Sequence, residues 1–315
     1  TSLRPHRASQ PRKAMLRNIA RTLTDTKWNI GFLQFDGKTE MPKWETVSWL
    51  KHNRKDRWYA DPFILSADGD LIKILAEEWF DSKKKGVISL LTVSQKGFKL
   101  EDSFPILELP THLSFPYILR DKDNTYILPE NCKSGTFSAY LLERNKLVKV
   151  AELLQEPLTD AVVDCKNFGG RNLIFSTTSA DPNGKILNIY ESDRPLGKYE
   201  KIGEVSFKDR CARNAGAFFK RNGHIVRPAQ DCNNGYGKGL VFQQIVEDGK
   251  LFRFKEIKRV YPSNTKWKHG LHTFNFRNEL AVVDGLAYRT PYIGAFLNKT
   301  GITQVAVNIR KSLVK

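Results

Sequence analysis

Short apolar runs rich in aromatic and β-branched residues alternate with polar turns along most of this chain. The turns hold Gly, Asn and Asp and lie at residues 67–70, 121–124, 169–172, 221–223 and 277–279. These residues supply the positive φ angles that tight hairpins require, and the flanking runs have the composition of strands. The pattern therefore predicts a succession of antiparallel hairpins, preceded by a short strand at 28–35.

A polar residue recurs at the start of the first strand of each unit. The five positions are Asp61, His112, Asp160, Arg213 and His272, with separations of 51, 48, 53 and 59 residues. One four-stranded blade of a β-propeller has about this length. β-Sandwiches and barrels also have regular strands and turns, but they do not normally place a polar side chain at one phase in every such unit. The sequence thus predicts an all-β fold, a single five-bladed β-propeller at 28–290.

Three segments complete the predicted organisation. The strand at 28–35 has no blade of its own, and the fifth unit has too few residues for four strands. We expect this strand to complete blade five, which closes the ring and removes an open sheet edge. Residues 1–27 are predicted to form a basic arm or linker, and residues 291–315 a C-terminal tail with a short helix near 302–313.

Polar residues also end the second strand of most units. They are Glu77 and Glu78, Glu130, the stretch from Arg227 to Asp231, and Asp284. In a propeller the innermost strands of all blades converge on one axis. We therefore expect the periodic polar residues to meet in one central pocket.

Composition and cysteine spacing narrow the setting. The chain is 40% hydrophobic and 27% charged, as in ordinary globular proteins, and its longest apolar run is too short for a membrane span. The basic start lacks the apolar stretch of a secretory signal. The spacing of the four cysteines fits neither a zinc site nor a compact disulfide framework, which favours free thiols in a reducing compartment. We expect a cytoplasmic location.

The net charge of +17 points to anionic partners. Specific nucleic-acid binding is not expected, because the basic residues are dispersed and no recognised motif appears. Residues 1–26 hold six basic residues against one acidic residue, so attachment of this arm to a membrane surface is the alternative to a linker. An anionic sugar donor fits the charge equally well. Since the chain begins at Thr1 rather than Met, a neighbouring domain is a further expected partner.

Carboxylates and their neighbours are the first candidates for chemistry. Asp61 follows Trp58 by three residues, and an aromatic ring beside a carboxylate suits the binding of a sugar. The aromatic ring packs against the C–H face of the sugar, and the carboxylate binds its hydroxyls. Glu130 lies across a predicted hairpin from His112, an arrangement that fits an acid–base pair or a phosphate donor as well as a structural role. Asp160 is preferred to Asp164, which we interpret as part of a solvated face.

Unit four is the densest in polar residues, which are Arg213, Arg227, Gln230, Asp231 and Tyr236. Two arginines suit the binding of a phosphate or a carboxylate, whereas a buried Arg–Asp lattice is the structural alternative. In unit five, His272 is expected to pair with Asp284 across a hairpin. No metal is predicted, because His269 and His272 point to opposite faces of a strand.

The ordered motifs resemble one known family. They are Trp58-x-Ala-Asp-Pro-Phe, Glu77, Gly86-x-Ile88, His112-Leu-Ser-Phe-Pro, Pro129-Glu130, Asp160-Ala161, Arg213-x-x-Gly216, Arg227-Pro-Ala-Gln-Asp231, Tyr236-Gly237, Gly270-x-His272-Thr and Asp284-Gly285. Over about residues 55–290 they are similar to the five-bladed propeller domain at the N-terminus of plant glucosamine inositolphosphorylceramide transferases and to relatives in bacterial polysaccharide loci. The resemblance implies a glycan-related role. In the plant enzymes a separate C-terminal domain carries the transferase fold.

The architecture also resembles the five-bladed arabinanases and invertases. Those enzymes place an Asp in blade one, an Asp in blade three and a Glu acid in blade four. Asp61 and Asp160 match the first two by position, whereas unit four offers Arg213 and Arg227 in place of a Glu. This departure counts against simple hydrolysis, which needs two carboxyl groups astride the bond.

Our first hypothesis is a glycosyltransferase without cofactor, whose donor substrate is a nucleotide- or lipid-phosphate sugar and whose acceptor is a glycan or glycolipid. Asp61 would be the base or would anchor the acceptor, and Glu77, Glu130 and Asp160 would hold hydroxyls. The leaving phosphate would be neutralised by Arg213, Arg227 and His272. Two alternatives remain open. One is a glycoside hydrolase or phosphorylase with Glu77 or Glu130 as acid, and the other is a non-catalytic glycan-binding module.

Overall fold

The computed structural model describes residues 25–38, 44–249, 251–262 and 266–290. The predicted C-terminal tail, 291–315, and nearly all of the predicted arm, 1–27, lie outside these residues. Residues Trp28–Gly285 form one compact unit, which holds all the predicted site residues. In the remaining unit, the Arg289 backbone amide donates to the Asp25 carbonyl over 2.9 Å.

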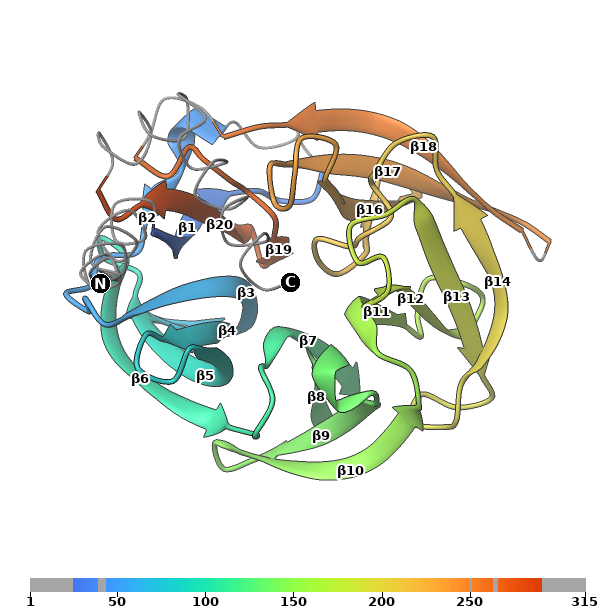
Figure 1. Cartoon of the computed structure of the whole chain (residues 1–315), viewed down its shortest axis with the longest axis horizontal. Coiled ribbons are helices and arrows are strands. Elements are labelled where there is room, and N and C mark those ends of the chain that lie inside the picture. The colour runs from blue at the N-terminus through green and yellow to red at the C-terminus, as the bar shows by residue number, and fades with distance from the viewer. Residues whose placement is uncertain (1–24, 39–43, 250, 263–265, 291–315) are drawn as a thin grey trace, which may run out of the picture. The chain divides into compact units, whose positions relative to one another are not determined.

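Five four-stranded antiparallel sheets are arranged as a ring (Figure 1). Blade one comprises β3 (Arg57–Asp68), β4 (Leu71–Phe80), β5 (Lys85–Ser94) and β6 (Lys99–Leu107). Blade two comprises β7 (Ser114–Asp121), β8 (Asn124–Glu130), β9 (Phe137–Glu143) and β10 (Lys146–Leu154). Blade three comprises β11 (Leu158–Asp164), β12 (Asn172–Thr178), β13 (Ile186–Ser192) and β14 (Glu200–Ser206). Blade four comprises β15 (Phe219–Arg221), β16 (His224–Asp231), β17 (Gly239–Asp248) and β18 (Leu251–Val260).

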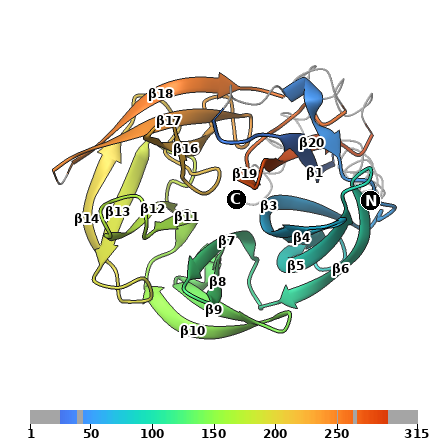
Figure 2. The ribbon, with the colours of Figure 1, turned by 180° about the vertical axis from the view of Figure 1, so that it is seen from behind.

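Blade five combines the two ends of the propeller sequence. Its strand order is β19 (Phe274–Arg277), β20 (Leu280–Tyr288), β1 (Thr26–Gln34) and β2 (Ser48–Trp49). Figure 2 shows the ring from behind, with β3, β7, β11 and β19 nearest its centre. Two short 3-10 helices, Trp44–Thr46 and Cys132–Ser134, lie between strands. The predicted all-β, five-bladed fold is confirmed.

Aromatic side chains fill the space between neighbouring blades. The rings of Phe63 and Phe115 meet edge to face at 5.0 Å between blades one and two, and Phe175 meets Phe252 at 5.3 Å between blades three and four. Such edge-to-face pairs add to the free energy gained by burying the rings. The core is therefore distributed around the ring, and each blade depends on both of its neighbours.

A β-bulge lies in the first half of the inner strand in each of the first three blades. Asp61, Phe115 and Asp160 stand at these bulges with φ of 50°, 42° and 44°, and the strand register shifts at each of them. This conformation is unfavourable for residues other than glycine and re-aims the side chain. The equivalent of Asp61 in blade two is thus Phe115. The prediction that His112 shares this phase was wrong, because the bulge residue of blade two is Phe115, three residues further along the chain.

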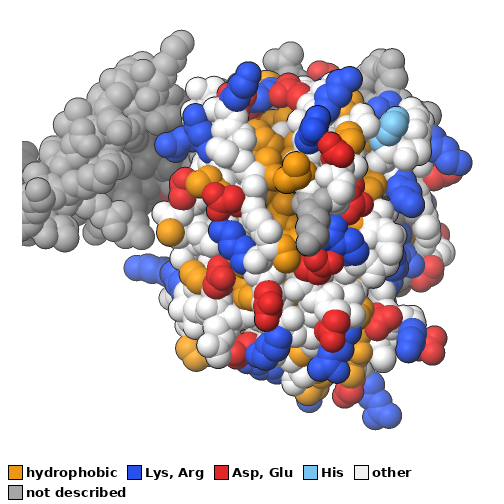
Figure 3. Space-filling view, turned by 90° about the vertical axis from the view of Figure 1, so that its right-hand side faces the viewer, with side chains coloured by type: hydrophobic (Ala, Val, Ile, Leu, Met, Phe, Trp, Pro, Cys, Tyr) orange, Lys and Arg blue, Asp and Glu red, His pale blue; other side chains and the backbone are white. Residues whose placement is uncertain are grey.

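Charges of both signs are mixed on the side of the molecule that carries blades three and four (Figure 3). Lys and Arg side chains stand beside Asp and Glu there, around a stripe of apolar side chains. Ile202 and Leu251 are among the exposed apolar residues, and both line a groove of about 390 Å³ between these blades. No helix in the described ranges is long and apolar enough to cross a membrane.

Close packing between blades four and five gives a test of the fold. A Cβ atom on Gly216 would overlap with the Phe274 carbonyl oxygen, next to the 2.7 Å bond from the Phe274 amide to the Ala215 carbonyl. We expect Gly216→Ala to lower the free energy of unfolding by about 2 kcal/mol, measured by urea denaturation, because the two backbones must separate. Gly203→Ala is the matched control, since a Cβ there meets nothing within 4 Å. Equal stability of the two variants would contradict this packing.

Candidate functional site

One side chain from the second strand of every blade occupies an equivalent position facing the axis. In blades one to three the pairs are Ala60 with Glu77, Ser114 with Glu130, and Thr159 with Thr177. In blade four the corresponding residue is Gln230, whose backbone amide donates to the Arg213 carbonyl. In blade five it is Asp284, which directly follows Val283, the partner of Phe274. Strand periodicity therefore brings three carboxyl groups, an amide and a hydroxyl toward one centre. We call these residues, with Asp61, Asp160, Arg213 and His272, the central cluster.

Carboxylates of the central cluster bind the strained backbone of the next blade. Asp284 accepts a hydrogen bond from the Asp61 amide at 3.2 Å, Asp61 accepts one from the Phe115 amide at 3.1 Å, and Glu130 accepts one from the Asp160 amide at 2.9 Å. Each bond joins two adjacent blades and satisfies the amide of a bulge residue. These bonds hold the bulges in place, and the same side chains form the centre of the site.

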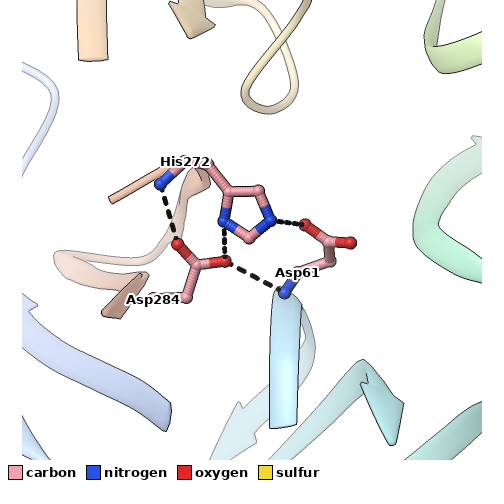
Figure 4. Close-up of side chains that lie close together, drawn as sticks. All are labelled: Asp61, His272 and Asp284. Carbon is pink, nitrogen blue, oxygen red and sulfur yellow. Dashed lines mark hydrogen bonds and ion pairs between the residues drawn. The ribbon is translucent and has the colours of Figure 1, made fainter. Parts of the chain in front are cut away.

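His272 bridges two of these carboxylates (Figure 4). Its Nδ1 lies 2.6 Å from Asp284 Oδ2, and its Nε2 lies 3.4 Å from Asp61 Oδ1. Burial alone would lower the pKa of His272, but the carboxylates of Asp284 and Asp61 outweigh it and raise the pKa to about 9. The ring is therefore a buried cation near neutral pH, and Trp28 stacks on it with centroids 4.0 Å apart.

Asp61, His272 and Asp284 are also the set of described residues that could chelate a metal. Their potential ligand atoms lie within 4.8 Å of one another. Each ring nitrogen, however, already lies against one of the two carboxylates, Nδ1 against Asp284 and Nε2 against Asp61. The geometry fits a protonated imidazole between two anions better than it fits an ion.

On the other side of the cluster, Arg213 joins Asp160 to Glu130. Its Nε donates to Asp160 Oδ2 at 2.6 Å, and its Nη2 donates to Glu130 Oε2 at 3.3 Å. Gln230 donates a further bond to Asp160 at 2.7 Å. Burial would raise the pKa of Asp160, but Arg213 outweighs it and holds the pKa below its usual range. Burial, reinforced by the Asp160 charge, raises the pKa of Glu130 to about 8.

Glu77 differs from the other acids because it lacks a strong partner. Its side chain is buried, and Oε1 has no hydrogen-bond partner among the described residues. Burial, followed by the charge of Asp61, raises the pKa of Glu77 well above its usual value. A Cβ on Gly86 would overlap with this carboxyl group, so glycine provides the space that Glu77 occupies. The group is a carboxylic acid that keeps its proton near neutral pH.

His112 is a titratable neighbour of Glu77, and its Nε2 lies 3.7 Å from Glu77 Oε1. The Gly86 amide donates to His112 Nδ1 at 2.8 Å, so Nδ1 is an acceptor and Nε2 carries the hydrogen. Burial lowers the pKa of His112 to about 4, which leaves the ring neutral. His112 therefore lies beside the cluster as a neutral donor, although it does not share the phase of Asp61.

Two of the predicted substrate-binding residues lie on the wrong face of β16. Arg227 is fully buried and donates to Asn214, to Gln243 and to the carbonyl oxygens of Cys211 and Ala212. Asp231 is bound by Arg259 at 2.9 Å and by Tyr261 at 2.6 Å. Residues 227, 229 and 231 share one face of the strand, whereas Gln230 faces the cluster. The prediction that Arg227 and Asp231 contact substrate was therefore wrong, and both are structural.

The two predicted aromatic residues lie at the margin of the cluster. Tyr236 is 40% exposed, and its ring packs against the Arg213 guanidinium at 4.9 Å and the His272 ring at 5.2 Å. Trp58 stacks on Trp79 with centroids 5.3 Å apart. Sequence reasoning missed Trp79, Trp28 and Thr177. Of these three residues, Thr177 could have been found from the sequence, because it occupies the same position in the second strand of its blade as Glu77 and Glu130 do in theirs.

The fold and the carboxylate-rich centre define the class of this protein, a five-bladed β-propeller with a polar central cluster. A family model described as "Glucosamine inositolphosphorylceramide transferase 1, N-terminal" matches residues 45–280. The chain belongs to this family.

Relatives in the family are much longer than this chain. Glucosamine inositolphosphorylceramide transferase 1 of Arabidopsis thaliana is 31% identical over 210 residues, and the protein of the same name from Oryza sativa subsp. japonica is 28% identical over 207 residues. Each match covers 63% of this chain and 27% of the relative, so the chain spans about a quarter of their length. Among solved structures, RS223 β-xylosidase matches 73% of this chain and 92% of its own with a TM-score of 0.53 at 7% identity, which shows a shared fold.

The position of Arg227 predicts an effect on stability. We expect Arg227→Ala to lower the free energy of unfolding by about 3–5 kcal/mol, because it leaves a cavity and unsatisfied buried acceptors. Urea denaturation measures the change. Arg253→Ala is the control, since Arg253 is an exposed arginine paired with Asp248 at 2.8 Å and should contribute little. A stable Arg227→Ala variant with weakened ligand binding would restore the original prediction.

The raised pKa values of His272 and Glu130 predict a loss of stability at alkaline pH. Stability from the His272 cation is complete below its unfolded pKa of 6.5 and is lost as the pH rises through about 9. Glu130 acts in the same direction between 4.5 and about 8, because the folded state holds its proton more tightly. We expect the free energy of unfolding to fall by up to ~5 kcal/mol between pH 6.5 and 9, about 3 kcal/mol from His272 and about 2 kcal/mol from Glu130. Glu130→Gln should flatten this fall in urea titrations, and a flat wild-type profile would refute the electrostatics.

Proposed function

We propose that this chain is a carbohydrate-active domain that transfers a glycosyl group to an acceptor hydroxyl. The proposal extends to the acceptor class, a glycan or a glycolipid, which the names of the plant relatives suggest. The observation that carries it is Glu77, a buried acid with an unpartnered oxygen beside ionised carboxylates. Membership of the family supports the sugar as the reacting group.

The cluster supplies the two roles that breaking a glycosidic bond requires. Glu77 gives its proton to the leaving oxygen as the bond from the anomeric carbon breaks. The anionic Asp160 stabilises the positive charge that develops on the sugar ring. Asp61 takes the proton of the acceptor hydroxyl as that oxygen attacks the anomeric carbon. Burial is the main cause that raises the pKa of Asp61 to about 6, a value suited to a base near neutral pH.

A phosphate-activated donor, our first hypothesis from the sequence, receives less support than a glycoside. In the described part of the cluster the cations are Arg213 and His272. Arg213 is committed to Asp160 and Glu130, and His272 lies between Asp61 and Asp284. A phosphate group would therefore meet more negative than positive charge at the centre.

Hydrolysis is the second candidate, because water can replace the acceptor hydroxyl. The pairing of a protonated Glu77 with ionised aspartates meets the general requirement of glycosidases for one acid and one carboxylate. Blade four places Gln230 rather than a Glu in the central cluster, which counted against hydrolysis, but Glu77 lies in the same cluster and offsets this. Transfer and hydrolysis therefore share the proton donor and differ in the acceptor.

Glu77→Gln tests the proposal. The purified chain is incubated with nucleotide sugars and with nitrophenyl glycosides, with and without oligosaccharide acceptors, and products are identified by mass spectrometry. We expect Glu77→Gln to lower kcat by a factor of about 10²–10⁴ and to leave KM nearly unchanged, because the amide fills the same space but cannot give a proton.

Glu78→Gln is the matched control. Glu78 faces the other side of the strand, where it is bound by Arg57, Tyr59 and Ser89, so its loss should not affect the turnover of folded protein. Equal turnover by wild type and Glu77→Gln would refute the proton-donor role. Glycan binding without turnover of any donor would favour the binding module, and products formed only with water would favour hydrolysis.

A further inference from the structure

A stacked pair of tryptophans lies on the same strands as Glu77. Trp58 on β3 pairs with Trp79 on β4, two positions from the pair of Ala60 with Glu77. Because side chains two residues apart point to the same face of a strand, Trp79 and Glu77 share a face. The two indole planes differ by 4°, and the ring centroids are 5.3 Å apart. Both side chains are partly exposed, whereas Trp28, Trp44 and Trp267 are buried.

His112 connects this pair to the acid. Its ring centroid lies 5.8 Å from that of Trp79 at 62°, and its Nε2 lies 3.7 Å from Glu77 Oε1. The bond from the Gly86 amide fixes the tautomer, so the N–H of His112 points away from Gly86. A continuous row of side chains therefore leads from the central cluster to the start of β3 and the end of β4. In order, the row consists of Glu77, His112, Trp79 and Trp58.

We propose that Trp58, Trp79 and His112 form a second sugar-binding subsite, so that the ligand is an uncharged glycan of at least two rings. This inference rests on the proposed function and adds the length of the ligand to it. A flat aromatic surface suits the C–H face of a pyranose ring, and a neighbouring uncharged N–H suits a sugar hydroxyl. One ring of the glycan occupies the central cluster, and the next lies over the tryptophans with the linking oxygen beside Glu77.

The neighbouring side chains argue against a charged group in this subsite. Phe80, the next residue after Trp79, has Arg57 at 4.5 Å and Lys83 at 5.0 Å from its ring centroid. Arg57 is itself paired with Asp56 and Glu78. The cations of this region are thus engaged beside the subsite, and the surface presented by the two tryptophans is apolar. An uncharged sugar ring matches that surface.

Ligand length and Trp79→Ala together test the subsite. A glycan array of mono- to trisaccharides identifies the tightest ligand of the wild-type chain, and calorimetry measures Kd for that ligand and for its monosaccharide. We expect the longer ligand to bind at least tenfold more tightly than the monosaccharide. Trp79→Ala should reduce this ratio to about one and leave Kd for the monosaccharide within twofold. Trp79→Phe should keep most of the ratio, because it retains an aromatic face.

Controls separate this inference from the function on which it rests. Melting temperatures verify that the variants fold. Leu251→Ala is the control substitution, because Leu251 is an exposed residue of the outer β17–β18 hairpin, and it should leave both Kd values unchanged. Equal affinity of the wild type for short and long ligands, or a ratio indifferent to Trp79→Ala, would overturn the subsite alone. No binding of any glycan by the wild type would overturn the proposed function as well.

Discussion

The hydrogen bonds that the amides of bulge residues donate to central carboxyl groups determine the rest of this structure. A bulge turns Asp61 or Asp160 toward the axis only in a backbone conformation that L-residues avoid. The carboxylate of the preceding blade compensates by satisfying the amide. Blade orientation, bulge geometry and the position of the acids are thus one arrangement, and a change at one member disturbs its neighbours.

Concentrating acids around two cations has a direct electrostatic consequence. The cluster cannot ionise every carboxyl group, because buried like charges repel and the interior solvates them poorly. Asp160 keeps its charge beside Arg213, whereas Glu77, without a cation of its own, keeps its proton. Environment rather than residue type therefore separates acid from base at this site.

Sequence periodicity predicted the blades and most of the cluster, because one blade is one repeat and the inner strands must converge. Asp61, Glu77, Glu130, Asp160, Arg213, Gln230, His272 and Asp284 do meet at one centre. The errors have physical causes. The bulge residue of blade two is Phe115 rather than His112, and the strand parity of β16 turned Arg227 and Asp231 away from Gln230. The pairing of Trp58 with Trp79 depends on the register of a hairpin, which composition does not specify.

The closing strand gives the site a fixed place in the order of folding. Trp28 on β1 stacks on His272, which lies more than 240 residues later in the chain. During synthesis the N-terminal strand must therefore wait until blade five emerges, and the site is completed by one of the most distant contacts in the propeller. An incompletely synthesised chain has no finished centre. Completion of the fold and acquisition of the site are one event.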